Sequence, residues 1–346
     1  MFGNFEFRLN SKRVDYKFLI KRKITRIIGN SASGKSELCR LIEAAKNPAT
    51  KIQISCPYTV NVLTDAEFRV VNYMLSKLDE KFTNHNSRAY ESKCREFLST
   101  YDQTLFFIDE TFQNVNTHDF STFCKYTDAF FVIFNRAPLN HLPYSFTEIY
   151  KMKESGKFHT IEPLYDSYSF AAFDDSVQIV TEDSHSAFQF LNSFQKNVIS
   201  ANGKSAILFK LTNEQCIFAD GSAFGSEIES ILHFIKENDL HIILFLPESF
   251  EYLLLKHLIT DKTVNQILNN LYANINGLYF SWERFFTELL TKYTSHMKNC
   301  YSKSNICKCY TNPCCIYERS VCNLKHCNDK YHMLFSKYLI DKGLSH

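Results

Sequence analysis

Short apolar runs, separated by segments with helical spacing, organise the first half of the chain. We expect strands over residues 5–9, 16–28, 51–55, 59–64, 104–109 and 129–134, a β-ribbon over 147–161 that turns at Ser155-Gly156, and helices over 35–45 and twice within 66–100. The runs over 104–109 and 129–134 do not alternate with polar residues, which is typical of central parallel strands buried on both faces. The pattern predicts an α/β domain whose parallel sheet is preceded by antiparallel strands.

From about Val177 the order of strands and helices begins again. We expect strands over 177–182, 198–201, 215–220 and 241–246, and helices over 184–195, 205–211, 226–238 and 249–259. This alternation predicts a second α/β domain with its own parallel sheet. Beyond about residue 262 the chain becomes helical and polar, and then rich in cysteine. The expected parts are therefore 1–165, 172–262 and a helical, Cys-rich region over 263–346.

The composition fits a folded chain of more than one domain, with 346 residues, 45% apolar and 22% charged. Its net charge of +2 does not by itself indicate a nucleic-acid binder, although a local basic channel stays open. No apolar segment approaches the roughly 20 residues that a membrane helix needs, and no signal-like apolar core stands near the start. We expect a cytoplasmic protein without a membrane partner, whose twelve cysteines are reduced thiols or metal ligands.

A glycine-bearing loop between a strand and a helix carries the strongest chemistry. It matches G-x-x-x-x-G-K-[ST] and consists of Gly29, Asn30, Ser31, Ala32, Ser33, Gly34, Lys35 and Ser36. Backbone N–H groups of such a loop wrap phosphates, and the helix N-terminus adds its dipole. Lys35 would reach the β- and γ-phosphates, and Ser36 would hold Mg²⁺. The motif predicts binding of ATP and Mg²⁺.

Three further residues follow apolar strands where such a site needs them. Asp109 ends the run over 104–109, the place of the acidic residue that positions Mg²⁺. Glu110 follows directly, where many ATPases carry a water-activating base, so Lys35 and Glu110 are the catalytic candidates. Arg136 comes after the run over 129–134 and could sense the γ-phosphate. The alternative for Arg136 is an ordinary residue at a strand end.

The antiparallel lead-in strands, GNSASGKS and FFIDE resemble the ATP-binding-cassette and AAA-like branch of the P-loop NTPases, over about residues 1–165. This resemblance implies an ATPase and, since such enzymes often complete their site across two copies, a homodimer. The chain departs from the cassette pattern. ESKCREFLSTYDQ stands where an LSGGQ-like segment is expected, and no histidine follows the next strand. Fast hydrolysis and cassette-style head-to-tail pairing are therefore not implied.

Three acidic residues stand at or just beyond the ends of successive expected strands in the second domain: Glu182, Asp220 and Glu248. The carboxyl ends of parallel strands open on one edge of a sheet, where ligands bind. Carboxylates that converge there repel each other unless a hard cation such as Mg²⁺ lies between them. The spacing predicts a metal site, and the alternative is a set of acidic helix caps.

Residues 172–262 resemble a Toprim domain, the metal-binding fold of topoisomerases, primases and overcoming-lysogeny-defect nucleases. The resemblance rests on the β-α order, a glutamate after the first strand and an Asp-Gly turn after a later one. It implies that Glu182 is a general acid/base or metal ligand and that Asp220 is a metal ligand. Ser222 stands in place of the family's second aspartate, and Ser186 in place of a second acidic residue near Glu182. Those departures put full nuclease activity in doubt.

Seven of the twelve cysteines lie between residues 300 and 327, with His326 and His332 close by. They are Cys300, Cys307, Cys309, Cys314, Cys315, Cys322 and Cys327. Thiolates and imidazoles at this density suit Zn²⁺, although no C-x₂-C pair is present. The alternative is a set of small apolar thiols within a helical region.

Together these features predict an ATP-binding protein, an ATPase, whose nucleotide state controls a Toprim-like domain that acts on or binds DNA or RNA. An ATPase followed by a Toprim domain is also the order of the overcoming-lysogeny-defect family, which implies nucleic-acid processing or phage defence. The alternative is a non-enzymatic, ATP-gated switch that binds a partner protein through an inactive Toprim-like domain.

Overall fold

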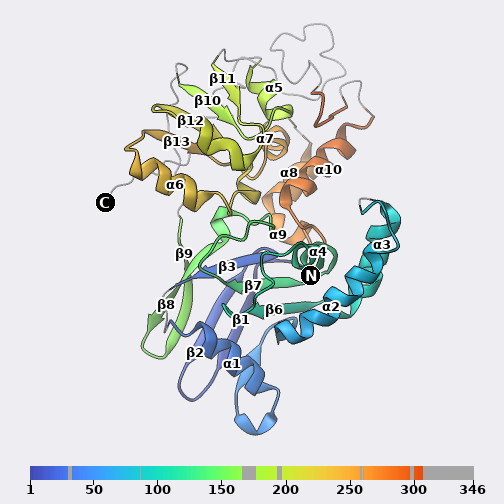
Figure 1. The fold of residues 1–346 in the computed structure, drawn as a ribbon, viewed down its shortest axis with the longest axis vertical. Coiled ribbons are helices and arrows are strands. Elements are labelled where there is room, and N and C mark those ends of the chain that lie inside the picture. Colours follow the sequence, from blue (N-terminus) through green and yellow to red (C-terminus); the bar gives the residue numbers. More distant parts are fainter. Residues whose placement is uncertain are drawn as a thin grey trace. The chain divides into compact units, whose positions relative to one another are not determined.

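The chain forms two compact units in a computed structural model, which describes residues 1–29, 33–85, 87–165, 177–192, 197–257, 259, 261–296 and 300–306. Unit 1 comprises Met1–Tyr165 and Tyr272–Phe280. Unit 2 comprises Asp166–Leu271 and Ser281–His346. Figure 1 shows the elements of both units in chain order. Each unit contains its own sheet, so the α/β class expected from the sequence is confirmed for both halves.

Unit 1 is built on a nine-stranded mixed sheet with the order β4-β1-β2-β9-β8-β3-β7-β6-β5. Its strands are β1 (Phe5–Asn10), β2 (Asp15–Ile20), β3 (Ile24–Ile28), β4 (Gln53–Ser55), β5 (Thr59–Val62), β6 (Thr104–Ile108), β7 (Phe130–Phe134), β8 (Ile149–Ser155) and β9 (Phe158–Pro163). Strands β5, β6, β7, β3 and β8 are parallel neighbours, whereas β4-β1-β2 and β8-β9 pair antiparallel. The parallel core and the antiparallel lead-in both match expectation.

The run over 16–28, expected as one strand, forms two: β2 and β3. Strand β2 pairs with β1 and β9, whereas β3 pairs with β7 and β8, so the chain changes neighbours between them. Residues 21–23 make this step, and Arg22 and Lys23 are buried there. Lys21, Arg22 and Lys23 interrupt the apolar alternation at this step, and the expectation of a single strand passed over that interruption. The sequence did not indicate that two of these basic side chains are buried.

Helices cover both faces of the parallel strands. They are α1 (Lys35–Ala45), α2 (Asp65–Asp79), α3 (Arg88–Leu98) and α4 (His118–Tyr126). Helix α1 buries Leu38, Leu41 and Ile42 in a cluster that contains Ile27 and Phe107. On the opposite face, rings of α4 contact rings of β6 and β7, as in Phe123–Phe106 and Phe120–Phe131. The sheet is thus buried on both sides, which explains the continuous apolar runs of β6 and β7.

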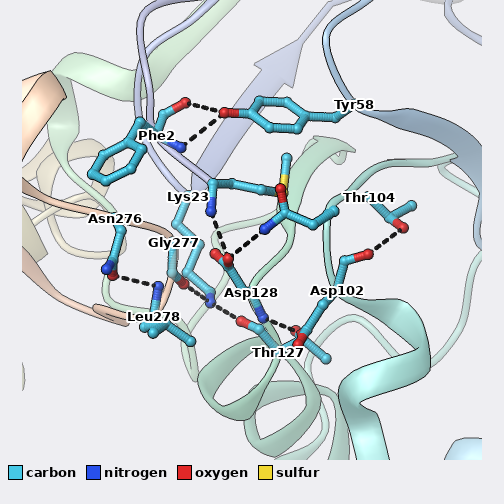
Figure 2. Close-up of polar contacts among 12 residues, drawn as sticks. Phe2, Lys23, Tyr58, Asp102, Thr104, Thr127, Asp128, Asn276, Gly277 and Leu278 are labelled. Atoms are coloured by element: carbon cyan, nitrogen blue, oxygen red, sulfur yellow. Dashed lines mark hydrogen bonds and ion pairs between the residues drawn. The ribbon is translucent and has the colours of Figure 1, made fainter.

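Residues 272–280 return to unit 1 although the chain on either side belongs to unit 2. Figure 2 shows how Lys23 fastens this segment: its buried Nζ donates to the carbonyl oxygens of Thr127 and Gly277. Asn276 also bridges to Phe2. A side chain at Gly277 has no room, since a Cβ would lie 2.5 Å from Asp128 Oδ1. The start of β3 and the approach to β7 therefore both contact the returning segment.

Unit 2 contains a four-stranded, fully parallel sheet with the order β11-β10-β12-β13, which confirms the second sheet expected from the sequence. The strands are β10 (Gln178–Thr181), β11 (Val198–Ser200), β12 (Gln215–Phe218) and β13 (Ile242–Phe245). The helices include α5 (Ser186–Asn192), α6 (Ile228–Glu237), α7 (Phe250–His257), α8 (Lys262–Asn269) and α10 (Trp282–Thr294); the short α9 (Leu271–Asn274) leads into the returning segment. Residues 204–210, expected as part of an α-helix, form a 3₁₀-helix in which only Ile207 is buried.

Among the described residues, no helix combines the length and the hydropathy that crossing a membrane requires. This finding agrees with the expectation drawn from the apolar runs of the sequence.

Candidate functional site

The described part of the glycine loop shows why its second glycine is needed. Gly34 has φ 82°, in the left-handed region, and it directly precedes α1. A Cβ at Gly34 would lie 2.9 Å from the hydroxyl of Tyr16. Helix α1 begins immediately after it, with Leu38 N donating to Gly34 O at 2.9 Å. Asn30, Ser31 and Ala32 lie outside the described residues.

Lys35 places its ammonium group at the centre of the loop. The side chain is only 5% exposed, and Nζ donates to Gly29 O at 2.7 Å and to Ser33 Oγ at 3.0 Å. The same Nζ lies 3.0 Å from Glu110 Oε1. A buried ammonium requires acceptors on several sides, and here the loop and the end of β6 supply them. Lys35 and Glu110, the two expected catalytic residues of unit 1, are therefore direct neighbours.

Ser36 and Asp109 also meet, although they lie 73 residues apart. Ser36 Oγ donates to Asp109 Oδ1 at 2.9 Å. Thr111 Oγ1 donates to the other carboxylate oxygen, Asp109 Oδ2, at 3.1 Å. The hydroxyl belongs to the first turn of α1, and the carboxylate follows β6. A hydroxyl and a carboxylate oxygen in contact form the kind of oxygen donor set that Mg²⁺ prefers.

Arg136 completes this group from a third segment. It follows β7, and its Nε lies 3.5 Å from Glu110 Oε2. Glu110 thus has a cation on each side, Lys35 at one carboxylate oxygen and Arg136 at the other. The described residues proposed for nucleotide and Mg²⁺ binding therefore lie in the loop and helix α1 that follow β3, or within two residues after the neighbouring parallel strands β6 and β7.

The aromatic side chains of Tyr16 and His159 lie next to Gly34, and the sequence had not indicated either of them as a site residue. The hydroxyl of Tyr16 donates to Gly34 O at 2.8 Å. Its ring stacks on His159 with centroids 4.8 Å apart. Burial raises the pKa of Tyr16 well above its usual value, so the hydroxyl stays protonated and remains a donor. Tyr16 lies on the buried face of β2, but no local signal in the sequence showed which loop it would contact.

In unit 2, Glu182 and Asp220 follow the adjacent parallel strands β10 and β12. Asp220 N donates to Glu182 Oε2 at 3.3 Å, and Phe250 N, at the start of α7, donates to Asp220 Oδ1 at 3.0 Å. Both acidic residues line a small cavity together with Ser186, Glu251 and Lys303. The two residues that the sequence singled out most strongly in this half are therefore brought together.

Glu248 is not among the described residues that line this cavity. After β13 the chain passes close to Gly221: Gly221 N donates to Pro247 O, and Ser222 N donates to Glu248 O. A Cβ at Gly221 would lie 2.4 Å from Leu246 O, so only glycine fits at this crossing. Besides Glu182 and Asp220, the cavity is lined by Asp183 and by Glu251, which lies in α7 and is 1% exposed. A carboxylate buried on the first turn of a helix leaves no periodic signal in the sequence.

Two residues from outside the sheet complete the acidic cavity. The hydroxyl of Tyr301 donates to Glu251 Oε1 at 2.6 Å and lies 3.1 Å from Ser186 Oγ. Lys303 forms an ion pair with Glu283 of α10. Glu251 Oε2 is buried, and no described residue forms a hydrogen bond with it. The cavity therefore combines several carboxylates with one ammonium group.

Burial shifts the protonation of this cluster. It raises the pKa of Glu182 to about 7. It also raises the pKa of Asp220, where Glu283 and Glu182 add repulsion, and that of Glu251. For Lys303, burial opposes the charged form, but Glu283, Asp220 and Glu251 together outweigh it and raise the pKa. The ammonium group is thus stabilised by the carboxylates, and the carboxylates hold protons more tightly than exposed ones do.

Among the residues that the structure describes, no group of three or more His, Cys, Asp and Glu side chains has the arrangement of a metal site. The expected zinc cluster falls largely beyond them. Of its cysteines only Cys300 is described, as an exposed free thiol, whereas Cys307, the later cysteines, His326 and His332 lie outside the described residues.

Comparison of the chain with models of known protein families and with curated protein sequences found no match.

Proposed function

We propose that unit 1 is a P-loop NTPase domain that binds ATP with Mg²⁺ and hydrolyses it. The observation that carries the proposal is the direct contact between Ser36 Oγ and Asp109 Oδ1, with Lys35 and Glu110 paired beside it. Two of these residues open a helix behind a glycine loop, and two end a central strand. If these residues only capped the ends of helices and strands, there would be no reason for a hydroxyl, an ammonium group and two carboxylates to meet at one edge of a sheet.

The residues divide the chemistry among them. The N-terminus of α1 and Lys35 attract the phosphate oxygens. Ser36 and Asp109 would hold Mg²⁺, which when bound neutralises charge on the β- and γ-phosphates. Glu110 would accept a proton from the attacking water, and its ion pairs with Lys35 and Arg136 support this role because they hold the carboxylate beside the loop. The guanidinium of Arg136 would stabilise the charge that develops on the γ-phosphate.

The test is ATP hydrolysis by the wild-type chain and by Glu110→Gln, with binding measured separately. We expect the variant to bind Mg·ATP with nearly unchanged affinity and to hydrolyse it about 10²- to 10⁴-fold more slowly, because only the proton acceptor is lost. A matched control is Glu43→Gln, which removes an exposed carboxylate of α1 that pairs with Lys46. Equal hydrolysis by wild type and Glu110→Gln would contradict the role of Glu110.

For unit 2 we propose a Toprim-like domain that binds a divalent cation and acts on nucleic acid, as in nucleic-acid processing or phage defence. The specific support is the acidic cavity, where Glu251 Oε2 is buried among Glu182 and Asp220 without a described partner. The alternative remains an ATP-gated switch that binds a partner protein. Its support is Lys303, whose ammonium already compensates part of the carboxylate charge.

Control of unit 2 by the nucleotide is proposed on the basis of chain connectivity. Residues 272–280 contact Lys23 and Asp128, directly ahead of the strands that lead to the glycine loop and to Arg136. Helix α10 begins at Trp282, and its Glu283 pairs with Lys303 at the acidic cavity. A change in β3 or β7 would therefore reach α10 through only a few residues of chain.

Plasmid DNA and structured RNA, incubated with Mg²⁺ or Mn²⁺ and with or without ATP, separate the two candidates for unit 2. Cleavage that is lost in Asp220→Ala but accompanied by unchanged ATP binding supports the metal-dependent enzyme. The same reaction with Lys35→Ala shows whether ATP permits or restrains cleavage. Absence of cleavage under every condition, with ATP still bound, supports the switch.

A further inference from the structure

Arg26 is the largest side chain that is fully buried in the described chain. It lies in β3, opposite Ile133 of β7 and Ile149 of β8. Removing a guanidinium from water is costly, and all of its N–H groups need acceptors. A charged group at this position, on a strand that otherwise consists mainly of isoleucine, calls for a reason other than packing.

The acceptors of Arg26 lie on the segment that carries Arg136. Arg26 Nη2 donates to Arg136 O at 2.6 Å, and Nε donates to Asn135 O at 3.2 Å. Nη1 donates to the buried hydroxyl of Tyr144 at 3.4 Å. The planar guanidinium therefore contacts two successive backbone carbonyls. Because the donors of an arginine have a fixed geometry, these bonds set the orientation of the two peptide units on either side of Arg136.

The same loop is also held on its far side. Asn116 Nδ2 donates to Pro138 O at 3.2 Å, and Asn116 Oδ1 accepts from Asn140 N at 3.2 Å. The side chain of Arg136, in contrast, is 57% exposed. Because this side chain is exposed, the backbone of Arg136 must be held in place if the guanidinium is to stay 3.5 Å from Glu110. The hydrogen bonds from Arg26 to Asn135 O and Arg136 O hold that backbone.

We propose that Arg26 is a positioning residue for ATP hydrolysis, which holds the Asn135-Arg136 peptide so that the Arg136 side chain stays beside Glu110. The proposal rests on the proposed function of unit 1. The observed hydrogen bonds of Arg26 to Asn135 and Arg136 hold the segment that carries Arg136, so we expect Arg26 to act on turnover, whereas Lys35 and Ser36 carry nucleotide binding. A lysine at this position keeps the charge but cannot reach two carbonyls and a hydroxyl with a planar fork.

The experiment compares ATP affinity and kcat for wild type, Arg26→Lys and Arg22→Lys. We expect Arg26→Lys to lower kcat about 10- to 100-fold with ATP affinity within about twofold, because a displaced catalytic group mainly affects the chemical step. Arg22→Lys is the matched control, since Arg22 is also buried but pairs with Glu148, which follows the segment that carries Arg136 and Tyr144 in the chain. It should leave kcat nearly unchanged. An unchanged kcat in Arg26→Lys would overturn the proposal.

A double-substitution cycle separates positioning from general loss of structure. Arg136→Ala should lower kcat, and Arg26→Lys in that background should lower it no further, because the group that Arg26 positions is already absent. Independent, multiplying losses would overturn the proposal. If Arg26→Lys does not fold, Tyr144→Phe tests the same contact more mildly, with an expected loss of about two- to fivefold in kcat and none in affinity.

Hydrogen exchange gives a readout that needs no nucleotide. Arg26→Lys should speed exchange of the backbone amides over residues 136–141 and leave α1 and α2 unchanged. If the wild-type chain does not hydrolyse ATP, the proposed function of unit 1 fails while faster exchange still establishes that Arg26 holds the loop. If hydrolysis is normal but exchange and kcat do not respond to the substitution, only the role of Arg26 is contradicted.

Discussion

Both units have their candidate site at the carboxyl edge of a parallel sheet, but the two sites are built differently. Unit 1 has a glycine loop around an ammonium group, and unit 2 has a cluster of buried carboxylates. In unit 1 the ammonium of Lys35 lies among a backbone carbonyl, a hydroxyl and the carboxylate of Glu110. In unit 2 the ammonium of Lys303 lies near Glu283, Asp220 and Glu251. The strand ends create the site in both cases. In our proposal, the residues that follow the strands decide whether the site takes an anionic phosphate or a cation.

The comparison also shows how differently the two sites are encoded. In unit 1 the loop residues and Ser36 are contiguous, and Asp109 and Glu110 directly follow an apolar strand. In unit 2, Glu251 comes from α7, Glu283 from α10 and Lys303 from a segment beyond the helices. The members of the candidate site in unit 1 could therefore be named from sequence, whereas only Glu182 and Asp220 of the acidic cavity could.

The largest expected effect that sharpens this comparison concerns Glu251 and Glu248. We expect Glu251→Gln to weaken Mn²⁺ binding by at least about tenfold, because it removes charge from an oxygen donor at the cavity. Glu248→Gln is the matched control and should change the affinity less than twofold, since Glu248 is not among the described cavity residues. Titration of the whole chain with Mn²⁺, followed by electron paramagnetic resonance, measures both. The reverse ranking would restore the triad expected from sequence.

A smaller effect concerns pH. Burial raises the pKa of Glu182 to about 7 from a usual 4.5. The folded chain therefore keeps this proton at a pH where the unfolded chain has lost it, so its contribution to stability is present below about pH 4.5 and is lost as pH rises toward 7. The charge of Lys303 changes only above about pH 10.5, so Lys303 does not contribute to the change in stability between pH 4.5 and 7. The lost contribution is up to about 3 kcal/mol.

Thermal unfolding in metal-free buffer checks this dependence. Unit 2 of the wild-type chain should unfold several degrees lower at pH 8 than at pH 5. Glu182→Gln should reduce the dependence, because an amide does not titrate, and should leave the part that comes from Asp220 and Glu251, whose pKa values burial also raises. A dependence of the same size in Glu182→Gln would assign it to other groups. Added Mg²⁺ should raise the midpoint more at pH 8 than at pH 5, since ligands must be deprotonated to bind metal.

The sequence predicted most elements because strong periodicity and buried runs specify local structure. It missed the break between β2 and β3, although Lys21, Arg22 and Lys23 interrupt the apolar alternation there, because burial of Arg22 and Lys23 depends on contacts elsewhere in the chain. It also predicted an α-helix around residues 205–211, where the structure has a 3₁₀-helix over Lys204–Lys210 with one buried residue. In both places tertiary contacts decide the structure, and a local pattern does not record them.

The same limit applies to the candidate site residues, which could be predicted only where a local motif marks them. Ser36, Asp109 and Glu110 stand at motif positions whose structural context is itself predictable. Arg26 and Tyr16 act through contacts with backbone carbonyls of distant loops, so their residue types gave no indication of a partner. Glu248 follows a strand, as the sequence predicted. At the close crossing beside Gly221, however, Glu248 makes contact through its backbone carbonyl, which accepts a hydrogen bond from Ser222 N.

Binding of Mg·ATP by wild type, Lys35→Ala and Lys46→Ala tests the central claim most directly. Both lysines belong to the same helical segment, but Lys35 lies buried in the loop whereas Lys46 pairs with Glu43 at the exposed end of α1. We expect Lys35→Ala to weaken binding by roughly 10- to 100-fold, as loss of a charge-assisted hydrogen bond does, and Lys46→Ala to bind as wild type. Equal affinity for ATP in the folded Lys35→Ala and wild-type chains would contradict the assignment of this loop as a phosphate site.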